Sequence, residues 1–159
     1  MKKEEKTNVM RTLESGKIAY KSHSYEPDPT MSGEQIAKIL GEDVSKVFKT
    51  LVTQGKSGAY YVFVVPVAAE LDLKKAARAA GEKAISMIRQ KELLPLTGYV
   101  HGGCSPIGMK KTFPTFLHET AMDQDTVYVS AGKVGFQIEL APDDLVKAAG
   151  CKTADIVSL

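Results

Sequence analysis

Tryptophan, cysteine and long apolar runs are scarce in this sequence, and each scarcity excludes a class of protein. The chain has no Trp and two Cys among 159 residues, too few cysteines for the disulfide framework of a small secreted domain. No apolar run approaches the roughly 20 residues that span a bilayer, so we expect no membrane association. Residues 1–16 carry basic side chains without a following apolar segment, unlike a secretory signal. A reducing cytoplasm is the expected location.

A strong charge of either sign is also missing. The formal net charge is +2, with 43% hydrophobic and 25% charged residues, which is typical of a globular protein and too mild to indicate nucleic-acid binding by itself. A local basic face remains open, and its candidates are Lys46, Lys74, Lys75, Arg78, Lys110, Lys111 and Lys133. The length and the absence of a linker predict one domain over residues 1–159.

Local capping signals predict the helices. Thr7 and Gly16 bound a helix over 7–15, and Ser32 with Gln35 forms a capping box for a helix that ends near residue 40. Asp72 caps an alanine-rich helix over 73–80, and "PDDL" from residue 142 begins the last helix.

Apolar and alternating runs predict the strands. They are "IAYKSHSY" (18–25), "FKTLVTQ" (48–54), "AYYVFVVPV" (59–67), "TFLH" (115–118), "TVYVS" (126–130), "GFQIEL" (135–140) and a final "ADIVSL" (154–159). Helices and strands are interspersed without a strict βαβ rhythm, so we expect an α/β (α+β) fold with a mixed, curled sheet and helices around it.

Motifs for several reaction classes fail on spacing. "GCSPIGMK" resembles a phosphate-binding loop, but its lysine comes one residue late. His101 and Cys104 have an H-x-x-C spacing, but a zinc site needs three or four ligands and no soft partner is paired nearby. We therefore expect no metal and no cofactor. Cys104 as a nucleophile assisted by His101 stays open, against the alternative of a small residue in a tight turn.

Three features remain, and the first two are compatible with an anionic ligand. Lys49 lies between Val47 and Leu51 on one face of its predicted strand, where it either snorkels to water or serves as a pocket cation. The loop "GYVHGGCSPIG" permits close backbone approach, and successive N–H groups of Gly102 and Gly103 can cradle an anion or oxyanion. "VSAGKVG" is a glycine-rich hairpin turn.

The order and spacing of several segments resemble the YbaK/EbsC family of aminoacyl-tRNA deacylases, including the editing module inserted in many prolyl-tRNA synthetases. The segments are "HSYEPDP", "FKTL", "LDLKKAARAAG", "TGYVHGGCSPIG", "YVSAGKVGFQIELAPDDL" and "ADIVSL". The resemblance covers nearly the whole chain. It implies a mixed, strongly curved, barrel-like sheet with surrounding helices.

The resemblance also implies a site. Lys49 matches the family lysine, Gly102 and Gly103 match the loop that approaches the aminoacyl ester, and these three form the expected catalytic group. The residues expected to bind substrate are Tyr25, Phe48, Thr50, Ser105, Ser130 and Gly132. Cys104 stands where an aliphatic or β-branched residue is expected, which argues against a catalytic thiol.

The activity implied is trans-editing, the removal of cysteine from mischarged Cys-tRNA(Pro) and also from Cys-tRNA(Cys). The thiol of the substrate would attack its own carbonyl, which agrees with the missing nucleophile. Cleavage by water, as for Ala- or Ser-tRNA, is one alternative. A non-catalytic module that binds tRNA or prolyl-tRNA synthetase is the other.

Overall fold

The computed structural model describes residues 6–28 and 30–158. Its α-helices are α1 (Asn8–Ser15), α2 (Gly33–Ile39), α3 (Leu73–Ala80), α4 (Gln90–Thr97) and α5 (Pro142–Ala149), with short 3₁₀ helices η1 (Val44–Lys46) and η2 (Glu119–Asp123). Its strands are β1 (Lys21–Ser24), β2 (Phe48–Gly55), β3 (Tyr60–Pro66), β4 (Ile85–Met87), β5 (Thr115–His118), β6 (Val127–Ser130), β7 (Phe136–Leu140) and β8 (Cys151–Ala154). Within these residues, every helix is too short or too polar to cross a bilayer.

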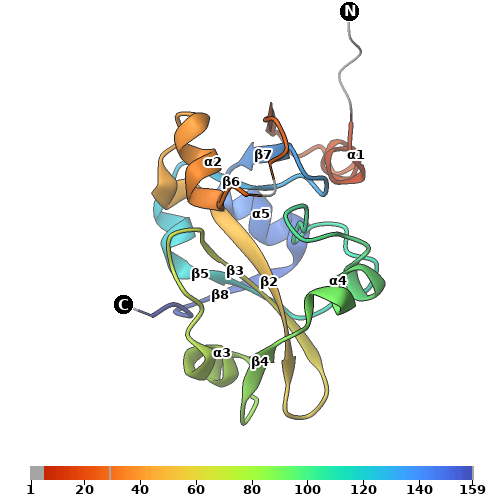
Figure 1. Ribbon diagram of the computed structural model, residues 1–159, viewed down its shortest axis with the longest axis vertical. Coiled ribbons are helices and arrows are strands. Elements are labelled where there is room, and N and C mark those ends of the chain that lie inside the picture. Colours follow the sequence, from red (N-terminus) through yellow and green to blue (C-terminus); the bar gives the residue numbers. More distant parts are fainter. Residues whose placement is uncertain (1–5, 29, 159) are drawn as a thin grey trace, which may run out of the picture.

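The strands form two sheets that meet at one bridge. The five-stranded sheet has the order β4-β2-β3-β5-β8, with β5 parallel to both β3 and β8 and the other pairs antiparallel. The three-stranded sheet β1-β7-β6 is antiparallel. A parallel bridge between Val47 and Tyr128 connects them, and Figure 1 shows β6 and β7 above the upper end of β2.

The mixed α/β fold agrees with the sequence-based expectation, but a barrel-like sheet is not confirmed. In the part of the chain that the structure describes, neither sheet closes on itself. The pairing between β2 and β6 stops after a single bridge, and farther along the chain the edge of β2 away from β3 pairs with β4. Two packed sheets therefore replace the single curled one.

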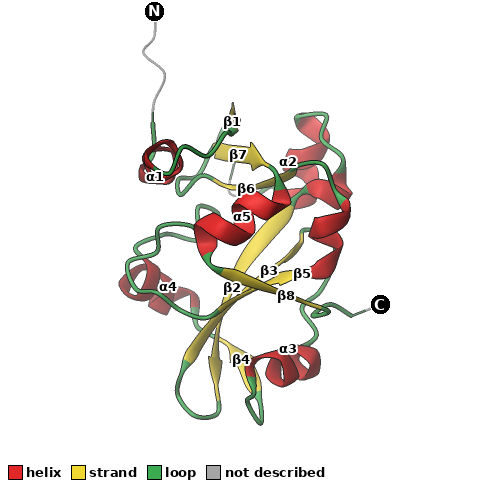
Figure 2. Cartoon of the chain, turned by 180° about the vertical axis from the view of Figure 1, so that it is seen from behind, coloured by secondary structure: helices red, strands yellow, loops and turns green. Residues whose placement is uncertain are grey.

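The main hydrophobic core lies between the two sheets. Phe48, Val64 and Leu117 of the five-stranded sheet pack in one cluster with Val129 and Ile138 of the three-stranded sheet. Helices α1 and α5 complete this cluster, and α3 covers a second cluster on the opposite face of the five-stranded sheet. Figure 2 shows α5 across the upper part of that sheet and α3 at its lower end.

The helix caps lie at the predicted residues, whereas the last strand does not. The side chains of Thr7 and Asp72 accept from first-turn N–H groups, and Ser32 with Gln35 forms the capping box. The prediction of a strand over 154–159 is wrong, because β8 ends at Ala154 and only Val157 makes a further bridge, to Leu71. Residue 159 lies outside the described residues.

The shared core gives a stability prediction. Ile138 is fully buried between the sheets, so Ile138→Ala should lower the free energy of unfolding by about 2–5 kcal/mol in urea titrations. Ile39, which is 66% exposed on α2, is the matched control, and Ile39→Ala should change stability by less than about 0.5 kcal/mol. Equal effects at both positions would contradict a core between the sheets.

Candidate functional site

Lys49 occupies an unusual place on β2. It pairs with Val65 of β3, and the next residue on its face, Leu51, pairs with Phe63. Thr50 pairs with Val64 on the opposite face, so the predicted alternation is confirmed. The Lys49 side chain is half-buried between these apolar neighbours, which removes part of its hydration.

The half-buried lysines differ in their partners. Lys46 donates to Asp125 at 2.6 Å, and Lys75 donates to Asp155 at 3.0 Å. Among the described residues, no carboxylate oxygen lies within 4 Å of Lys49 Nζ. A partly desolvated cation without an acidic partner is suited to an anionic ligand.

The bridge between the sheets places Lys49 on the same side as Ser130. Lys49 lies two residues after Val47, Ser130 lies two residues after Tyr128, and the bridged strands run in parallel. Because side chains alternate along a strand, Lys49 and Ser130 fall on the same face as the bridged pair. β2 and β6 pack against each other over this stretch.

The glycine loop is shaped by one conformational requirement and one close contact. Gly102 has φ 85°, and the Gly103 N–H donates to Val100 O at 3.0 Å, which closes a turn. A Cβ on Gly103 would lie 2.9 Å from Val134 N, so only glycine permits the loop to approach the β6–β7 turn this closely. The Gly103 N–H is therefore used within this turn, and its donation to an oxyanion stays a prediction.

Two further contacts hold Tyr99 and Tyr25 beside the same turn. A Cβ on Gly132 would lie 3.0 Å from Tyr99 Cε1, and the Tyr99 hydroxyl donates to Ile107 O of the glycine loop. The Tyr25 N–H donates to Gly135 O at 2.9 Å. The β6–β7 turn, the glycine loop and the segment after β1 thus meet at one place, as Figure 1 shows for the first two.

Three of the predicted substrate-binding residues point into the protein. Phe48 is 3% exposed in the core between the sheets. Ser105 is fully buried, and its hydroxyl accepts from the Ile107 N–H. Thr50 Oγ1 is buried and has no hydrogen-bond partner among the described residues. Phe48 and Ser105 therefore support the site from behind in this conformation.

Polar residues that the sequence did not single out lie beside Ser130. Gln137 pairs with Ser130 on one side and with His23 on the other. With the amide nitrogen of Gln137 facing Glu42, it donates to the carboxylate at 2.7 and 3.1 Å. His23 Nε2 contacts Glu139 at 2.9 Å. The alternation in "GFQIEL" was the only feature of the sequence that could have placed Gln137 on the polar face. No local pattern in the sequence indicated that Glu42 lies beside it.

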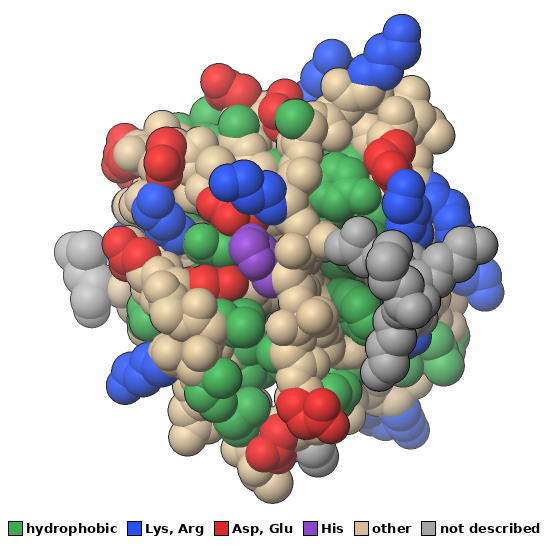
Figure 3. Space-filling view, turned by 90° about the horizontal axis from the view of Figure 1, so that it is seen from above, with side chains coloured by type: hydrophobic (Ala, Val, Ile, Leu, Met, Phe, Trp, Pro, Cys, Tyr) green, Lys and Arg blue, Asp and Glu red, His purple; other side chains and the backbone are tan. Residues whose placement is uncertain are grey.

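Electrostatics distinguishes Glu42 from its neighbours. Burial raises the pKa of Glu42, against the opposing effect of His23. Burial also raises the pKa of Tyr128, and the nearby Glu139 and Glu42 charges add to this. Figure 3 looks onto this end of the molecule, where a histidine lies beside acidic side chains. The outer face of the three-stranded sheet is therefore polar and rich in carboxylates.

Burial of Cys104 argues against a covalent cysteine mechanism. Burial raises the pKa of Cys104 to about 12, so the thiol is protonated at neutral pH. His101 is exposed, whereas Cys104 is 9% exposed against Val52 and Val62.

The described residues hold no group of three or more His, Cys, Asp or Glu side chains that could bind a metal ion.

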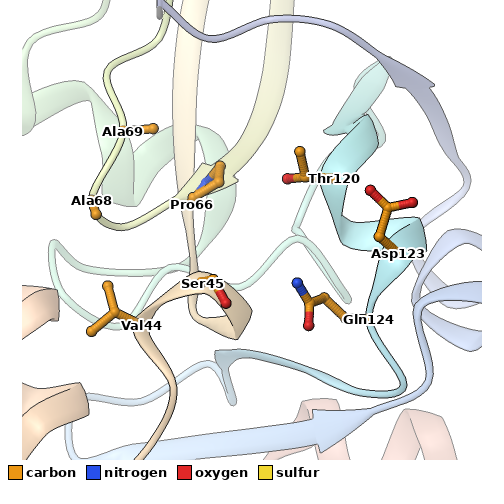
Figure 4. A pocket seen from close by; sticks show the side chains of 8 residues that line it. All are labelled: Val44, Ser45, Pro66, Ala68, Ala69, Thr120, Asp123 and Gln124. Atoms are coloured by element: carbon orange, nitrogen blue, oxygen red, sulfur yellow. The ribbon is translucent and has the colours of Figure 1, made fainter.

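A separate groove lies away from these residues. It has a volume of about 540 Å³ between η1, the segment after β3 and η2 (Figure 4). Its lining residues are Val44, Ser45, Pro66, Ala68, Ala69, Thr120, Asp123 and Gln124. Asp123 is the one charged residue in that lining, and no predicted site residue takes part in it.

Comparisons with known proteins agree with one another. Residues 27–148 match the family described as the aminoacyl-tRNA editing domain. EbsC of Enterococcus faecalis, provisionally named a Cys-tRNA(Pro)/Cys-tRNA(Cys) deacylase, is 45% identical over 158 residues, covering 99% of this chain and 96% of EbsC. A proline–tRNA ligase of Thermosipho africanus is 31% identical over 78 residues, which are 49% of this chain and 14% of the ligase.

The fold comparison points the same way. A crystal structure provisionally described as a trans-editing enzyme for prolyl-tRNA synthetase superposes with a TM-score of 0.80 at 26% identity. The superposition covers 96% of this chain and 99% of that one. The likeness thus extends over nearly the full length of both chains.

The unpartnered hydroxyl of Thr50 gives a stability prediction. Thr50→Val removes a buried oxygen without a partner, so the free energy of unfolding should rise by roughly 1 kcal/mol in urea titrations. Thr53 on the same strand is the control, because its hydroxyl donates to Tyr61 O at 2.9 Å. Thr53→Val should not stabilise the protein. Destabilisation by Thr50→Val would show that its hydroxyl is hydrogen-bonded.

Glu42 gives a prediction about pH. The folded pKa of Glu42 lies above its ordinary value of 4.5, so the ionised carboxylate destabilises the fold, and the wild-type protein loses stability as pH rises from about that value through the folded pKa. Glu42→Gln should therefore be more stable than wild type at pH 7, with a difference that disappears at pH 4. Thermal unfolding at both pH values measures this. A difference independent of pH would argue against burial of the charge.

Proposed function

Because the chain belongs to the aminoacyl-tRNA editing domain family, we propose that it is a trans-editing deacylase that removes cysteine from mischarged Cys-tRNA(Pro). The observation that carries the proposal is Lys49, a half-buried lysine without an acidic partner among the described residues, on the face that holds Ser130. The name of EbsC supports cysteine as the amino acid. Such a substrate places the reaction in the cytoplasm.

Lys49 supplies the positive charge in this proposal. The ester carbonyl develops negative charge on its oxygen when it is attacked, and the 3′-terminal phosphate of the RNA is already an anion. A lysine in a partly apolar setting stabilises either group more than one in bulk water. Ser130 keeps a hydroxyl proton to donate, since its oxygen accepts from the Gly132 N–H at 3.2 Å.

In this proposal, the backbone N–H group that stabilises the oxyanion belongs to Gly102. The Gly103 amide is engaged with Val100, whereas the Gly102 N–H has no acceptor among the described residues. Gly103 instead fixes the loop against the β6–β7 turn through its close approach to Val134. We assign Gly102 to oxyanion binding, Gly103 to positioning, and Tyr25 and Gly132 to the walls beside them.

The substrate provides the nucleophile. The cysteine sulfur attacks the ester carbonyl, an S–C bond forms and the C–O bond to the ribose breaks. The thiol proton passes to the departing ribose oxygen, and the amino acid leaves as a cyclic thioester. The enzyme then needs only to orient the ester and stabilise the oxyanion. The mechanism therefore selects cysteine by its reactivity. Selection by the size of a pocket would be weak, because a difference of one methylene changes the binding free energy by only about 1–3 kcal/mol.

Replacement of Lys49 tests the proposal. Lys49→Met keeps the length of the side chain and removes its charge, so loss of ester from Cys-tRNA(Pro) should slow by at least about two orders of magnitude with an unchanged unfolding midpoint or a higher one. Lys56, which is exposed in the turn after β2, is the matched control, and Lys56→Met should react at the wild-type rate. Cys104→Ser should also remain active.

The same assay with Cys-, Ala-, Ser- and Pro-tRNA separates the alternatives. Rapid clearance of Ala- or Ser-tRNA in preference to Cys-tRNA would identify a water-dependent hydrolase. Protection of every ester at catalytic protein concentrations would identify a binding module. Addition of prolyl-tRNA synthetase shows whether a complex with the synthetase, which we propose as a partner, accelerates the reaction.

A further inference from the structure

The basic residues lie in different parts of the structure. Lys46 and Lys75 form ion pairs with Asp125 and Asp155. Lys110, Lys111 and Lys133 belong to the two segments that meet at the glycine loop. These segments contain no acidic residue: none occurs over 93–118, and none over 126–138. The charge of the chain is near neutral overall but positive along these two segments.

Local contacts fix the backbone at Lys110 and the side chain of Lys133, and we call these two positions, with Lys111, the rim of the site. The Lys110 N–H donates to Thr97 O at 2.8 Å, beside Gly98 at the end of α4. Lys133 lies in the β6–β7 turn, where Nζ stands 5.4 Å from the centre of the Phe136 ring. The Gly103 backbone packs directly on Lys133 and Val134. The two ends of the rim are thus joined through the loop that carries Gly102.

His101 adds a flat, exposed ring on the glycine loop itself. It occupies the turn that Gly103 closes onto Val100, and its side chain is exposed, as are those of Lys110, Lys111 and Lys133. Lysines bind phosphates, and imidazole rings stack on unpaired bases. The groove in Figure 4 lacks both features, since its only charged lining residue is Asp123.

We propose that Lys110, Lys111, Lys133 and His101 form the surface that binds the unpaired 3′ segment of the RNA, with phosphates on the lysines and a base on the imidazole. This rests on the proposed function for the identity of the substrate. The ester on the terminal ribose then reaches Gly102 and Lys49 from the side of the β6–β7 turn. Affinity for RNA comes from this rim, and Lys49 acts on the reacting end.

Charge reversal at the rim tests the surface separately from the chemistry. For Lys110→Glu/Lys111→Glu, kcat/KM on Cys-tRNA(Pro) should fall about tenfold or more at low salt, and the slope of log kcat/KM against log salt should flatten by about 1.4, or roughly 0.7 per lost contact with single-stranded RNA. Cleavage of cysteinyl-adenosine, which lacks phosphates, should be unchanged. His101→Ala should weaken binding without changing the salt slope.

The matched control reverses two exposed charges elsewhere. Lys74→Glu/Arg78→Glu makes the same change in charge on α3, at the lower end of the molecule in Figure 1, and should leave the salt slope as in wild type. An equal loss in this control, or an equal loss on cysteinyl-adenosine in the rim variant, would overturn the proposal.

A binding measurement tests the rim independently of catalysis. If the wild-type protein cleaved neither substrate, that result would count against the deacylase function alone. The probe is a fluorescein-labelled single-stranded RNA followed by anisotropy at several salt concentrations. The rim variant should bind it at least about tenfold more weakly than wild type, and the α3 variant should bind it equally well. Equal binding by all three proteins would refute the surface.

Discussion

The bridge between Val47 and Tyr128 is the constraint on which the site depends. One pair of residues sets the register between two sheets that otherwise form separate ladders. A shift of one residue in β2 would turn Lys49 into the core and bring Thr50 onto the outer face, because side chains alternate. The core contacts of Phe48 with Val127 and Val129 prevent that shift, since Phe48 would then move from the apolar cluster to the polar face.

The same outer face carries charge of both signs, and their arrangement explains why Lys49 stays available. Glu42 is held by the amide of Gln137, and Glu139 by His23 and Thr126. Lys46, just before β2, forms an ion pair with Asp125. Glu42, Glu139 and Asp125 thus each have a partner other than Lys49, so under the proposed function the cation binds an anionic substrate without first breaking an ion pair. Breaking a partly buried pair would subtract from the binding energy.

Prediction from sequence succeeded where the signal is local and failed where distant partners decide. Thr7, the Ser32–Gln35 box and Asp72 define helix starts within four residues, so α1, α2 and α3 followed from the sequence. The last strand was misplaced because β8 is fixed by its parallel pairing with β5, from Cys151 opposite Thr115. Glu42 was missed because its partner Gln137 lies far along the chain. The sequence indicated that Lys49 is unusual, because it lies between two aliphatic residues on one face of its strand. Only the structure shows that no acidic partner lies near it among the described residues.

The two adjacent glycines have different structural roles in a loop that, under the proposed function, supplies no nucleophile. Gly102 is needed for its positive φ, and Gly103 for its contact with the Val134 backbone. A side chain at 103 would separate the loop from the β6–β7 turn, and with it Lys110 and Lys111 from Ser130. Cys104, next in the chain, is buried and protonated. The loop therefore contributes shape and one amide, and under the proposed function the reactive sulfur arrives with the substrate.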